Sequence, residues 1–327
     1  MTLVSFIVLS FRRFDTTTGP CLASLEPACR LTGQELVLVD NGSDDGAADR
    51  CAEWAAAHPE VVYRPQATNL GFGGGMNAGV DASQGDWVCL VNSDTIFPPG
   101  AVQALIATLG DVPDTVAMVG PVTNEAGNGQ RLPLPELPMD AVPAVGAAAM
   151  GAPTRLLTPA YRTDFFCVAV RRSAWQQLGG LDPVFGLGYY EDFDFSLRLR
   201  RAGLEQVIAE DVFVAHVGSA SFATLGKAQR ALMRRNRGLL RRRHPDVRFE
   251  HVREGNAKAL HHLVDVAERD GWTDALRRRA AWRLAALAWD EPKSPFKRWR
   301  WRLRQRVLRR RLAVAGITPR FPVQELL

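Results

Sequence analysis

The chain has 327 residues, of which 46% are hydrophobic and 23% charged, and this balance excludes a wholly disordered or fibrous protein. Residues 1–220 carry 13 Lys and Arg against 25 Asp and Glu, a net charge of −12, whereas residues 221–327 carry 27 against 10, a net charge of +17. The total of +5 therefore hides two oppositely charged parts. Such asymmetry is typical of an acidic catalytic core with a basic surface that meets an anionic partner.

Apolar segments that do not alternate with polar residues recur along the first 120 residues, with helical stretches between them. The first, Leu3–Phe11, lacks a preceding basic region and a following cleavage site, so it predicts a strand rather than a signal peptide. Strands that are apolar on both faces are typical of a parallel sheet covered by helices, which predicts a doubly wound, mostly parallel α/β fold. The expected strands are Val4–Leu9, Leu36–Val39, Val61–Tyr63, Trp87–Val91 and Ala117–Val119, and the expected helices are Thr17–Ala28, Gly46–Ala57, Gly73–Ala82 and Gly100–Leu109.

The rest of the chain changes character twice. The segment Asn124–Pro159 is rich in Gly, Ala and Pro and predicts a long connection. Strands are expected near Phe165–Val170 and Val207–Val214, around a helix that starts near Asp192. Beyond Ser219 the composition is that of basic helices, so we expect a catalytic domain over residues 1–222 and a basic helical region over residues 223–327.

Polar residues follow three of the expected strands. Asp40-Asn41-Gly42-Ser43 comes after the second strand and Asn92-Ser93-Asp94 after the fourth, while the glycine-rich stretch Asn69–Asn77 follows the third. Each stretch alone also suits a turn or a helix cap. Together they would meet at the carboxyl edge of the sheet, where a carboxylate can bind a ribose or base and a glycine loop lets backbone N–H groups approach a diphosphate. Since a carboxylate beside a diphosphate requires a bridging cation, Asp94 is predicted to bind Mg²⁺ or Mn²⁺.

A second polar group surrounds the start of the later helix. Glu191, Asp192 and Asp194 lie where acidic residues are ordinary complements of the helix dipole. They follow two glycines and the pair Tyr189-Tyr190, which favours a mobile aromatic loop. An acidic pair beside aromatic rings is a common way to hold a sugar and to deprotonate its hydroxyl. Core packing is the alternative for the two tyrosines.

His216 follows the apolar run Val212–Ala215 and precedes a Gly/Ser-rich loop at 218–221. Most single histidines are structural or surface residues. A strand end beside a flexible loop also suits a ligand of a metal or phosphate.

The cysteines and the apolar runs bear on the compartment. No run reaches the ~18 to 20 apolar residues of a spanning helix, so any membrane contact is expected to be peripheral. Neither a C-x-x-C pair nor metal-ligand spacing occurs among the five cysteines, which predicts reduced packing residues of a cytoplasmic protein. They are Cys21, Cys29, Cys51, Cys89 and Cys167.

In chain order, these motifs resemble the family 2 glycosyltransferases with the GT-A fold, in particular their bacterial rhamnosyltransferase-like branch. The resemblance covers about residues 3–222 and rests on the segments around Asp40, Asn69–Asn77, Asn92–Asp94, Glu191–Asp194 and His216. It implies that the following residues bind a nucleoside-diphosphate sugar donor: Ser10, Asp40, Asn41, Ser43, Asn69, Gly71, Phe72, Asn77, Asn92, Ser93 and Asp94.

The resemblance also implies a reaction. A sugar would pass from a donor of UDP-hexose or dTDP-rhamnose type to a hydroxyl of a glycan or polyprenyl-linked acceptor, with inversion, in cell-surface polysaccharide or glycolipid biosynthesis. Asp192 stands at the position of the general base, with Glu191 beside it to orient the acceptor, and Tyr189 and Tyr190 are the candidate acceptor-binding residues.

The metal site departs from the family pattern. Asn92 replaces the first acid of the Asp-x-Asp motif, so Asp94 would hold Mg²⁺ or Mn²⁺ with His216.

The basic tail leaves two interpretations open. On a helix, Trp301, Leu303, Val307 and Leu308 would lie roughly on one side, either packed on the core or facing an anionic membrane on the inner face of the cell. A nucleic-acid-binding protein is an alternative function, but no recognition-helix or aromatic RNA-binding motif is found, so no nucleic acid partner is expected. A sugar-nucleotide pyrophosphorylase would need a glycine directly after the first strand, where Ser10-Phe11-Arg12-Arg13 has none.

Overall fold

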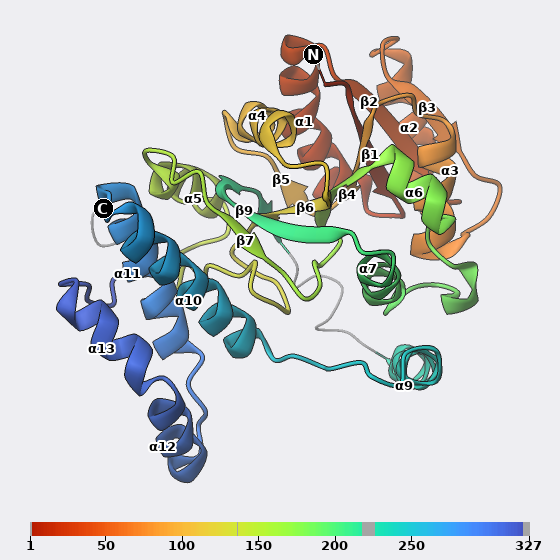
Figure 1. Ribbon diagram of the computed structural model, residues 1–327. Helices are drawn as coiled ribbons and strands as arrows, with labels where there is room; N and C mark the ends of the chain where they lie inside the picture. Colours follow the sequence, from red (N-terminus) through yellow and green to blue (C-terminus); the bar gives the residue numbers. More distant parts are fainter. Residues whose placement is uncertain (1, 136, 218–225, 323–327) are drawn as a thin grey trace.

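The computed structural model describes residues 2–135, 137–217 and 226–322 (Figure 1). Its strands are β1 (Val4–Ser10), β2 (Glu35–Asp40), β3 (Val62–Pro65), β4 (Trp87–Asn92), β5 (Thr95–Ile96), β6 (Val116–Val122), β7 (Leu157–Pro159), β8 (Cys167–Arg171), β9 (Glu205–Phe213) and β10 (Ala215–His216). Eight of them form one sheet in the order β3-β2-β1-β4-β8-β6-β9-β7, and β10 pairs with β5 in a separate two-stranded sheet.

Helices cover both faces of the large sheet, as the apolar strands predicted. One core lies between the sheet and α1, α2 and α4, and a second lies between the sheet and α3, α6 and α7. The helices are α1 (Thr18–Thr32), α2 (Ala47–Ala56), α3 (Gly71–Asp81), α4 (Ala101–Asp111), α5 (Val142–Met150), α6 (Arg172–Leu178), α7 (Glu191–Arg201), α9 (Lys227–Arg243), α10 (Val252–Asp270), α11 (Asp274–Trp289), α12 (Pro295–Arg304) and α13 (Arg306–Val314).

The sheet is mostly parallel in its first half and mixed in its second. β3, β2, β1 and β4 are parallel neighbours, and β6 and β9 are also parallel. β8 runs antiparallel to both of its neighbours, β4 and β6, and β7 runs antiparallel to β9. The mostly parallel α/β fold is thus confirmed. The reversal of β8 decides which of its ends lies at the candidate site.

The segment Asn124–Pro159 was predicted to be a connection, but its described residues include the helix α5 and the edge strand β7. Residue 146 of α5 is a glycine, and a Cβ at this position would lie 2.1 Å from the ring of Phe213 at the end of β9. The glycine therefore lets α5 pack directly on the strand. Composition alone favoured a loop because six of the nine residues of α5 are Gly, Ala or Pro.

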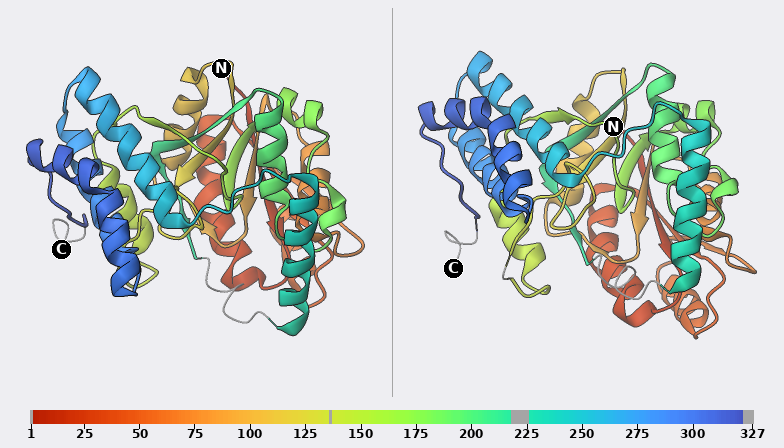
Figure 2. Two further views of the ribbon diagram at one scale, coloured as in Figure 1. Left: turned by 60° about the horizontal axis from the view of Figure 1, so that its bottom comes forward. Right: turned by 90° about the horizontal axis from the view of Figure 1, so that it is seen from below.

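The basic C-terminal region divides into two parts. Helices α10 to α13 gather on one side of the molecule, whereas α9 lies on another side next to α7 (Figure 2). A separate core joins α10, α11, α12 and α13 through residues such as Leu260, Leu284, Trp301 and Leu308. The predicted boundary between residues 222 and 223 lies outside the described residues.

A buried ionic cluster ties α11 to the sheet. Glu210 of β9 is fully buried, and its carboxylate accepts hydrogen bonds from Thr158 (2.8 Å), Arg279 (3.1 Å) and Arg283 (3.1 Å). Burial by itself would raise the pKa of Glu210, but the positive charges of Arg283 and Arg279 outweigh it and hold that pKa below its ordinary value. The helical region is therefore part of the folded core rather than a loose tail.

We predict that Glu210→Gln lowers the free energy of unfolding by about 3 to 5 kcal/mol, because it leaves two buried guanidinium groups without a full counter-charge. Urea unfolding of the full chain measures this. Glu205→Gln, on an exposed position of the same strand, is the matched control and should change stability by less than about 0.5 kcal/mol. Equal effects of the two substitutions would contradict the importance of the cluster.

The predicted one-sided apolar stripe of the tail is wrong, because residues one or two positions apart face different sides of a helix. A break at Gln305 also separates α12 from α13. Trp301 and Leu308 are buried in the C-terminal core, as the packing interpretation predicted, whereas Leu303 and Val307 are exposed. The exposed apolar face also includes Phe296 and Trp299 of α12, which the sequence interpretation left out.

Among the described residues, no helix is both long and apolar enough to cross a lipid bilayer.

Candidate active site

Three parallel strands end side by side at one edge of the sheet. The register pairs Ser10 of β1 with Asp40 of β2, and Leu9 with Asn92 of β4. β8 begins at this same edge because it runs antiparallel to β4, and the backbone N–H of Asn92 donates to the carbonyl of Phe166 (2.8 Å). The polar strand ends that the sequence singled out therefore lie at one edge.

The tip of β2 is hydrogen-bonded to the start of α3. The Asp40 carboxylate is buried and accepts from the hydroxyl of Ser43 (2.6 Å). The side-chain amide of Asn41 donates to Oδ1 of Asn69 (3.1 Å) and to the carbonyl of Gly71 (3.1 Å). Five of the predicted donor-binding residues thus form one connected group.

The predicted glycine loop is the first part of helix α3. A Cβ at Gly75 would lie 2.4 Å from the side chain of Leu9, and one at Gly71 would lie 2.2 Å from the carbonyl oxygen of Gly186. Glycine therefore lets α3 approach β1 and lets the loop before α7 touch the helix start. The backbone N–H of Phe72 donates to the carbonyl of Leu187 (3.3 Å), so the candidate donor and acceptor segments are in contact.

Two predicted donor-binding side chains point into the protein. Ser10 is fully buried, and its hydroxyl lies 2.9 Å from that of Thr18. The side chain of Asn77 donates to the carbonyl of Leu181 (2.8 Å) and accepts from its N–H (3.0 Å). In this structure both side chains support neighbouring segments.

His216 lies beside Asp94 because β10 pairs with β5, which places His216 opposite Thr95. Nε2 of His216 is 3.4 Å from Oδ1 of Asp94, and Nδ1 is 3.0 Å from the carbonyl of Glu125. A carbonyl only accepts, so Nδ1 carries the proton and Nε2 of the neutral ring is left with its lone pair. Burial disfavours the charged ring, but in that ring Nε2 donates to Asp94, and this hydrogen bond together with the charge of Asp94 outweighs burial and raises the pKa of His216. The Gly/Ser loop predicted after His216 lies outside the described residues.

Asp192 is the second residue of α7, and its side chain is 24% exposed. Its Oδ2 lies 4.0 Å from the guanidinium of Arg162, which is also bound to Asp164 and stacks over the ring of Phe193 (5.2 Å). Desolvation raises the pKa of Asp192 to about 6; Arg162 opposes this rise and Asp164 adds to it. A carboxylate that exchanges its proton near neutral pH suits general base catalysis.

Glu191 is more deeply buried than Asp192. Its Oε2 has no hydrogen-bond partner, and burial together with the charge of Asp192 raises the pKa of Glu191 to about 8. At pH 7 the Glu191 carboxyl is therefore mostly protonated. It can donate a hydrogen bond, while the ionised Asp192 can accept one.

We predict that Glu191→Gln keeps most of the activity and flattens the pH dependence of stability. A raised pKa in the folded state means that the Glu191 carboxyl favours folding below its unfolded pKa and that this contribution is lost as pH rises through about 8. Thermal unfolding between pH 5 and 9 should show the wild type losing stability relative to Glu191→Gln. Parallel curves for the two proteins would contradict a protonated Glu191.

The turn before α7 has an unusual backbone. Tyr189 and Tyr190 both have a positive backbone φ, +72° and +77°, in the left-handed region that residues other than glycine rarely adopt. The ring of Tyr190 packs edge-on against Phe249 (6.2 Å between centroids).

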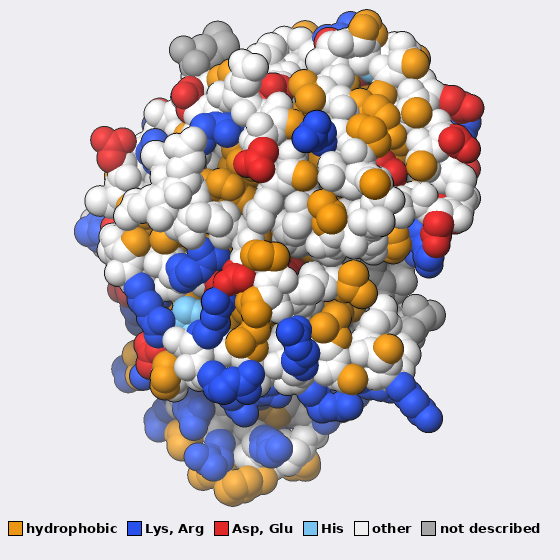
Figure 3. All heavy atoms as spheres, turned by 90° about the vertical axis from the view of Figure 1, so that its right-hand side faces the viewer, with side chains coloured by type: hydrophobic (Ala, Val, Ile, Leu, Met, Phe, Trp, Pro, Cys, Tyr) orange, Lys and Arg blue, Asp and Glu red, His pale blue; other side chains and the backbone are white. Residues whose placement is uncertain are grey.

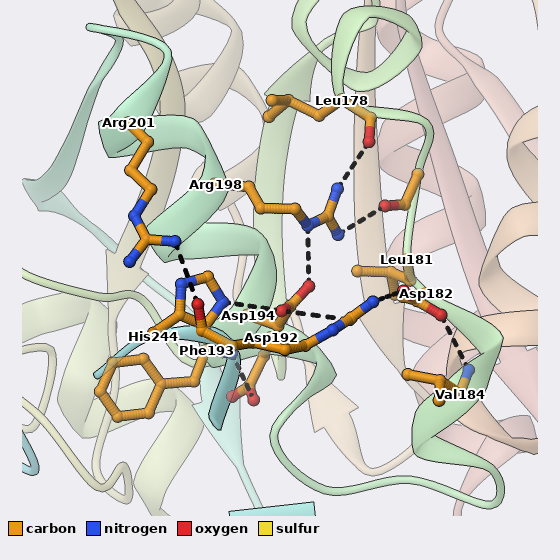
Figure 4. A network of polar contacts seen from close by, with 12 residues as sticks. Leu178, Leu181, Asp182, Val184, Asp192, Phe193, Asp194, Arg198, Arg201 and His244 are labelled. Atoms are coloured by element: carbon orange, nitrogen blue, oxygen red, sulfur yellow. Dashed lines mark hydrogen bonds and ion pairs between the residues drawn. The ribbon is translucent and has the colours of Figure 1, made fainter. Parts of the chain in front are cut away.

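Asp194 does not reach the site edge, since it is buried and bonded to His244 (2.8 Å) and Arg198 (2.7 Å) (Figure 4). Its role in the structure is to tie α7 to the end of α9.

Arg162 and Asp164 were missed by the sequence analysis. They precede β8, and a parallel strand would have placed them at the far edge of the sheet. The charge of Asp164 raises the pKa of both Asp192 and His216, which connects it electrostatically to the candidate base and to a candidate metal ligand. Their position just before an apolar strand could have indicated that they lie at the site, but only if the direction of that strand had been known.

Comparison with known proteins bears directly on this arrangement. The model of the family described as glycosyl transferase family 2 matches residues 5–174, more than half of the chain. The chain belongs to this family. Membership confirms the predicted class of protein, a glycosyltransferase, over the two alternative classes.

Curated relatives of this glycosyltransferase come from several bacteria. An N-acetylglucosaminyl-diphospho-decaprenol L-rhamnosyltransferase of Mycobacterium tuberculosis is 29% identical over 207 residues, which cover 55% of this chain and 66% of the relative. A putative glycosyltransferase, EpsH, of Bacillus subtilis is 28% identical over 115 residues, which cover 35% of this chain and 32% of that protein. The glycosyltransferase thus spans just under two thirds of the first relative's length.

A solved structure also shares the fold of this glycosyltransferase. GalNAc-T7, determined with UDP, GalNAc and Mn²⁺, superposes with a TM-score of 0.53 at 14% identity over 80% of this chain and 55% of that chain. The likeness confirms the predicted GT-A-like fold class.

Proposed function

We propose that this glycosyltransferase transfers a sugar, with inversion, from a nucleoside-diphosphate sugar to a hydroxyl of a lipid-linked acceptor. The main support is that Asp40 and the Asp94–His216 pair follow strands that end at one edge of the sheet. Asp192 lies 4.0 Å from Arg162, which precedes β8 at the same edge. The name of the M. tuberculosis relative favours a dTDP-rhamnose type of donor, with UDP-hexose as the second choice, and an acceptor joined to a polyprenol through a diphosphate.

The residues at Asp94 fit a divalent cation. Asp94 supplies a carboxylate oxygen and His216 an imidazole nitrogen, which together suit Mn²⁺ or Mg²⁺ when a substrate diphosphate fills further positions. Among the described residues, no cluster of three or more His, Cys, Asp or Glu side chains offers a complete protein cage. The two-residue set therefore suits a cation that arrives with the donor. When bound, the cation would offset negative charge on the departing diphosphate.

The transfer itself depends on the proton affinity of Asp192. Its carboxylate takes the proton from the acceptor hydroxyl, whose oxygen forms a bond to the anomeric carbon of the donor sugar. The bond from that carbon to the diphosphate oxygen breaks, and its electron pair leaves with the nucleoside diphosphate. Attack from the opposite face in a single displacement inverts the anomeric centre. Glu191, protonated at pH 7, is suited to donate a hydrogen bond to the acceptor.

A panel of nucleoside-diphosphate sugars, each with and without Mn²⁺, tests the proposed reaction. We expect one sugar nucleotide to raise the melting temperature in a Mn²⁺-dependent manner and to release its nucleoside diphosphate when a polyprenyl-diphosphate-linked acceptor is added. NMR of the product should show an inverted anomeric configuration. Retained configuration, or stabilisation by nucleoside triphosphates alone, would contradict the proposal.

We further propose that α12 and α13 attach the enzyme to an anionic membrane on its cytoplasmic side. Phe296 (64% exposed), Trp299 (60% exposed), Leu303 and Val307 are exposed apolar residues of these two helices. The helices also carry cations that form no ion pair with an acidic side chain of the described residues, namely Lys297, Arg300, Arg304, Arg306 and Arg310. Lys and Arg side chains gather over the lower half of the molecule, and apolar side chains lie at its lower end (Figure 3). Exposed apolar side chains together with cations are typical of helices that bind the interface of anionic bilayers.

We predict that the double substitution Phe296→Ser and Trp299→Ser weakens binding to vesicles of anionic phospholipid by at least about tenfold, because each removes a large exposed apolar side chain from α12. Vesicle sedimentation of the full chain measures this. Leu31→Ser, an equally exposed apolar site on α1, should leave binding unchanged. Unaltered sedimentation of the double variant would rule out these side chains as the contact.

A further inference from the structure

Helix α9 reaches back to the turn that precedes Asp192. Asn236 of α9 is fully buried, and its Nδ2 donates to the carbonyls of Phe185 (2.7 Å), Gly188 (2.8 Å) and Tyr189 (3.1 Å). Its Oδ1 accepts from the guanidinium of Arg235 (2.9 Å). One side-chain amide therefore serves three carbonyls of a single turn.

That turn needs an external support. Two consecutive tyrosines, Tyr189 and Tyr190, have left-handed backbone angles, each of which costs about 1 kcal/mol or more. Without Asn236, the buried carbonyls of Phe185 and Gly188 would lose hydrogen bonds, and the strained conformation would lose its main polar restraint.

The other side of the same turn lies against the candidate donor segment. The carbonyl of Gly186 packs on Gly71, and the carbonyl of Leu187 accepts from the N–H of Phe72. The turn is therefore held between α3 and α9, and its position fixes where Glu191 and Asp192 begin. A second contact supports α7 from the C-terminal end of α9, where His244 is bonded to Asp194 (2.8 Å).

We infer that Asn236 is a positioning residue for the transfer reaction. It sets the distance between the donor segment at the start of α3 and the carboxylates at the start of α7, without touching either substrate. This inference rests on the proposed function, because it assigns to that reaction the geometry that Asn236 maintains. Within the described part of the chain, Asn236 is the side chain of α9 that donates to three carbonyls of this turn, whereas Arg235 donates to one backbone carbonyl there, that of Val184.

Two matched substitutions in the full chain separate positioning from general stability. Asn236→Leu removes the amide from the turn. Asn256→Leu makes the same change at an equally buried asparagine of α10, whose side chain bonds to Arg283 and Asp290 away from the site. Both variants are expected to lower the melting temperature. Hydrogen exchange of the peptide covering residues 183–193, kcat with the acceptor used for the wild type, and the Kd of the nucleoside diphosphate are then measured.

We expect Asn236→Leu alone to speed exchange in residues 185–190 by at least about tenfold and to lower kcat by at least about tenfold, with Kd within about threefold of the wild type. Wild-type exchange in this peptide, or equal loss of kcat in the two variants, would overturn the inference. A wild-type chain with no transferase activity would instead defeat the proposed function, while the exchange measurement would still decide whether Asn236 holds the turn.

Discussion

Asp192→Asn is expected to lower kcat by at least about a hundredfold while leaving donor affinity within about twofold of the wild type. The amide has the size of the carboxylate but cannot take a proton from the acceptor hydroxyl. Release of nucleoside diphosphate under saturating substrates measures kcat, and calorimetry measures donor binding. The wild-type kcat should also fall as pH drops through about 6, because protonation removes the base, and this limb should be absent from the variant.

Asp111→Asn is the matched control for this experiment. Asp111 ends α4 and is exposed, so the same chemical change there should leave kcat unaltered. Loss of less than about tenfold in Asp192→Asn would remove Asp192 as the base. Loss of donor affinity with unchanged kcat would place its role in binding.

Asp94→Ala is expected to abolish the gain in donor affinity that Mn²⁺ provides. The Asp94 carboxylate lies 3.4 Å from Nε2 of His216, and its removal leaves this pair with a single imidazole, too weak a ligand for a hard cation at ordinary concentrations. The effect should exceed about tenfold in the Kd of the sugar nucleotide measured with Mn²⁺. Without the metal, the variant and the wild type should bind alike.

The control for Asp94→Ala is Asp114→Ala, an exposed residue before β6. It should show the full metal effect. Unchanged metal-dependent affinity in Asp94→Ala would exclude Asp94 as a metal ligand and direct attention to Asp164, the next carboxylate along the edge.

The first four parallel strands could be predicted because each is a short apolar run between helices, a pattern that differs from that of an alternating surface strand. Asp40, Asn92 and Asp94 followed from the same reasoning, since parallel strands bring their carboxyl ends together. The direction of β8 could not be predicted in this way. A central strand buried on both faces has the same apolar sequence whichever way it runs, so Arg162 and Asp164 were overlooked.

Residues outside strand ends were harder still to predict. Asn236 lies in a helix with eight Lys and Arg among seventeen residues, and nothing local distinguishes the face that enters the protein. The face of α9 that enters the protein depends on contacts between distant segments, which periodicity within one segment does not encode. The error in the tail is of another kind: Trp301 and Leu303 are two residues apart on α12 and therefore face nearly opposite sides of the helix, so one is buried and the other exposed.

Donor, cation and base are proposed to meet at one edge of the sheet. Crystals grown with Mn²⁺ and the nucleoside diphosphate of the active donor locate all three, because anomalous scattering at the manganese edge identifies the metal. We expect a manganese peak bound by Asp94 and His216, a nucleoside beside Asp40, and Asp192 facing the diphosphate across an open space for the acceptor. A nucleotide and manganese bound elsewhere, with Asp94 and Asp192 both free of them, would rule out this arrangement.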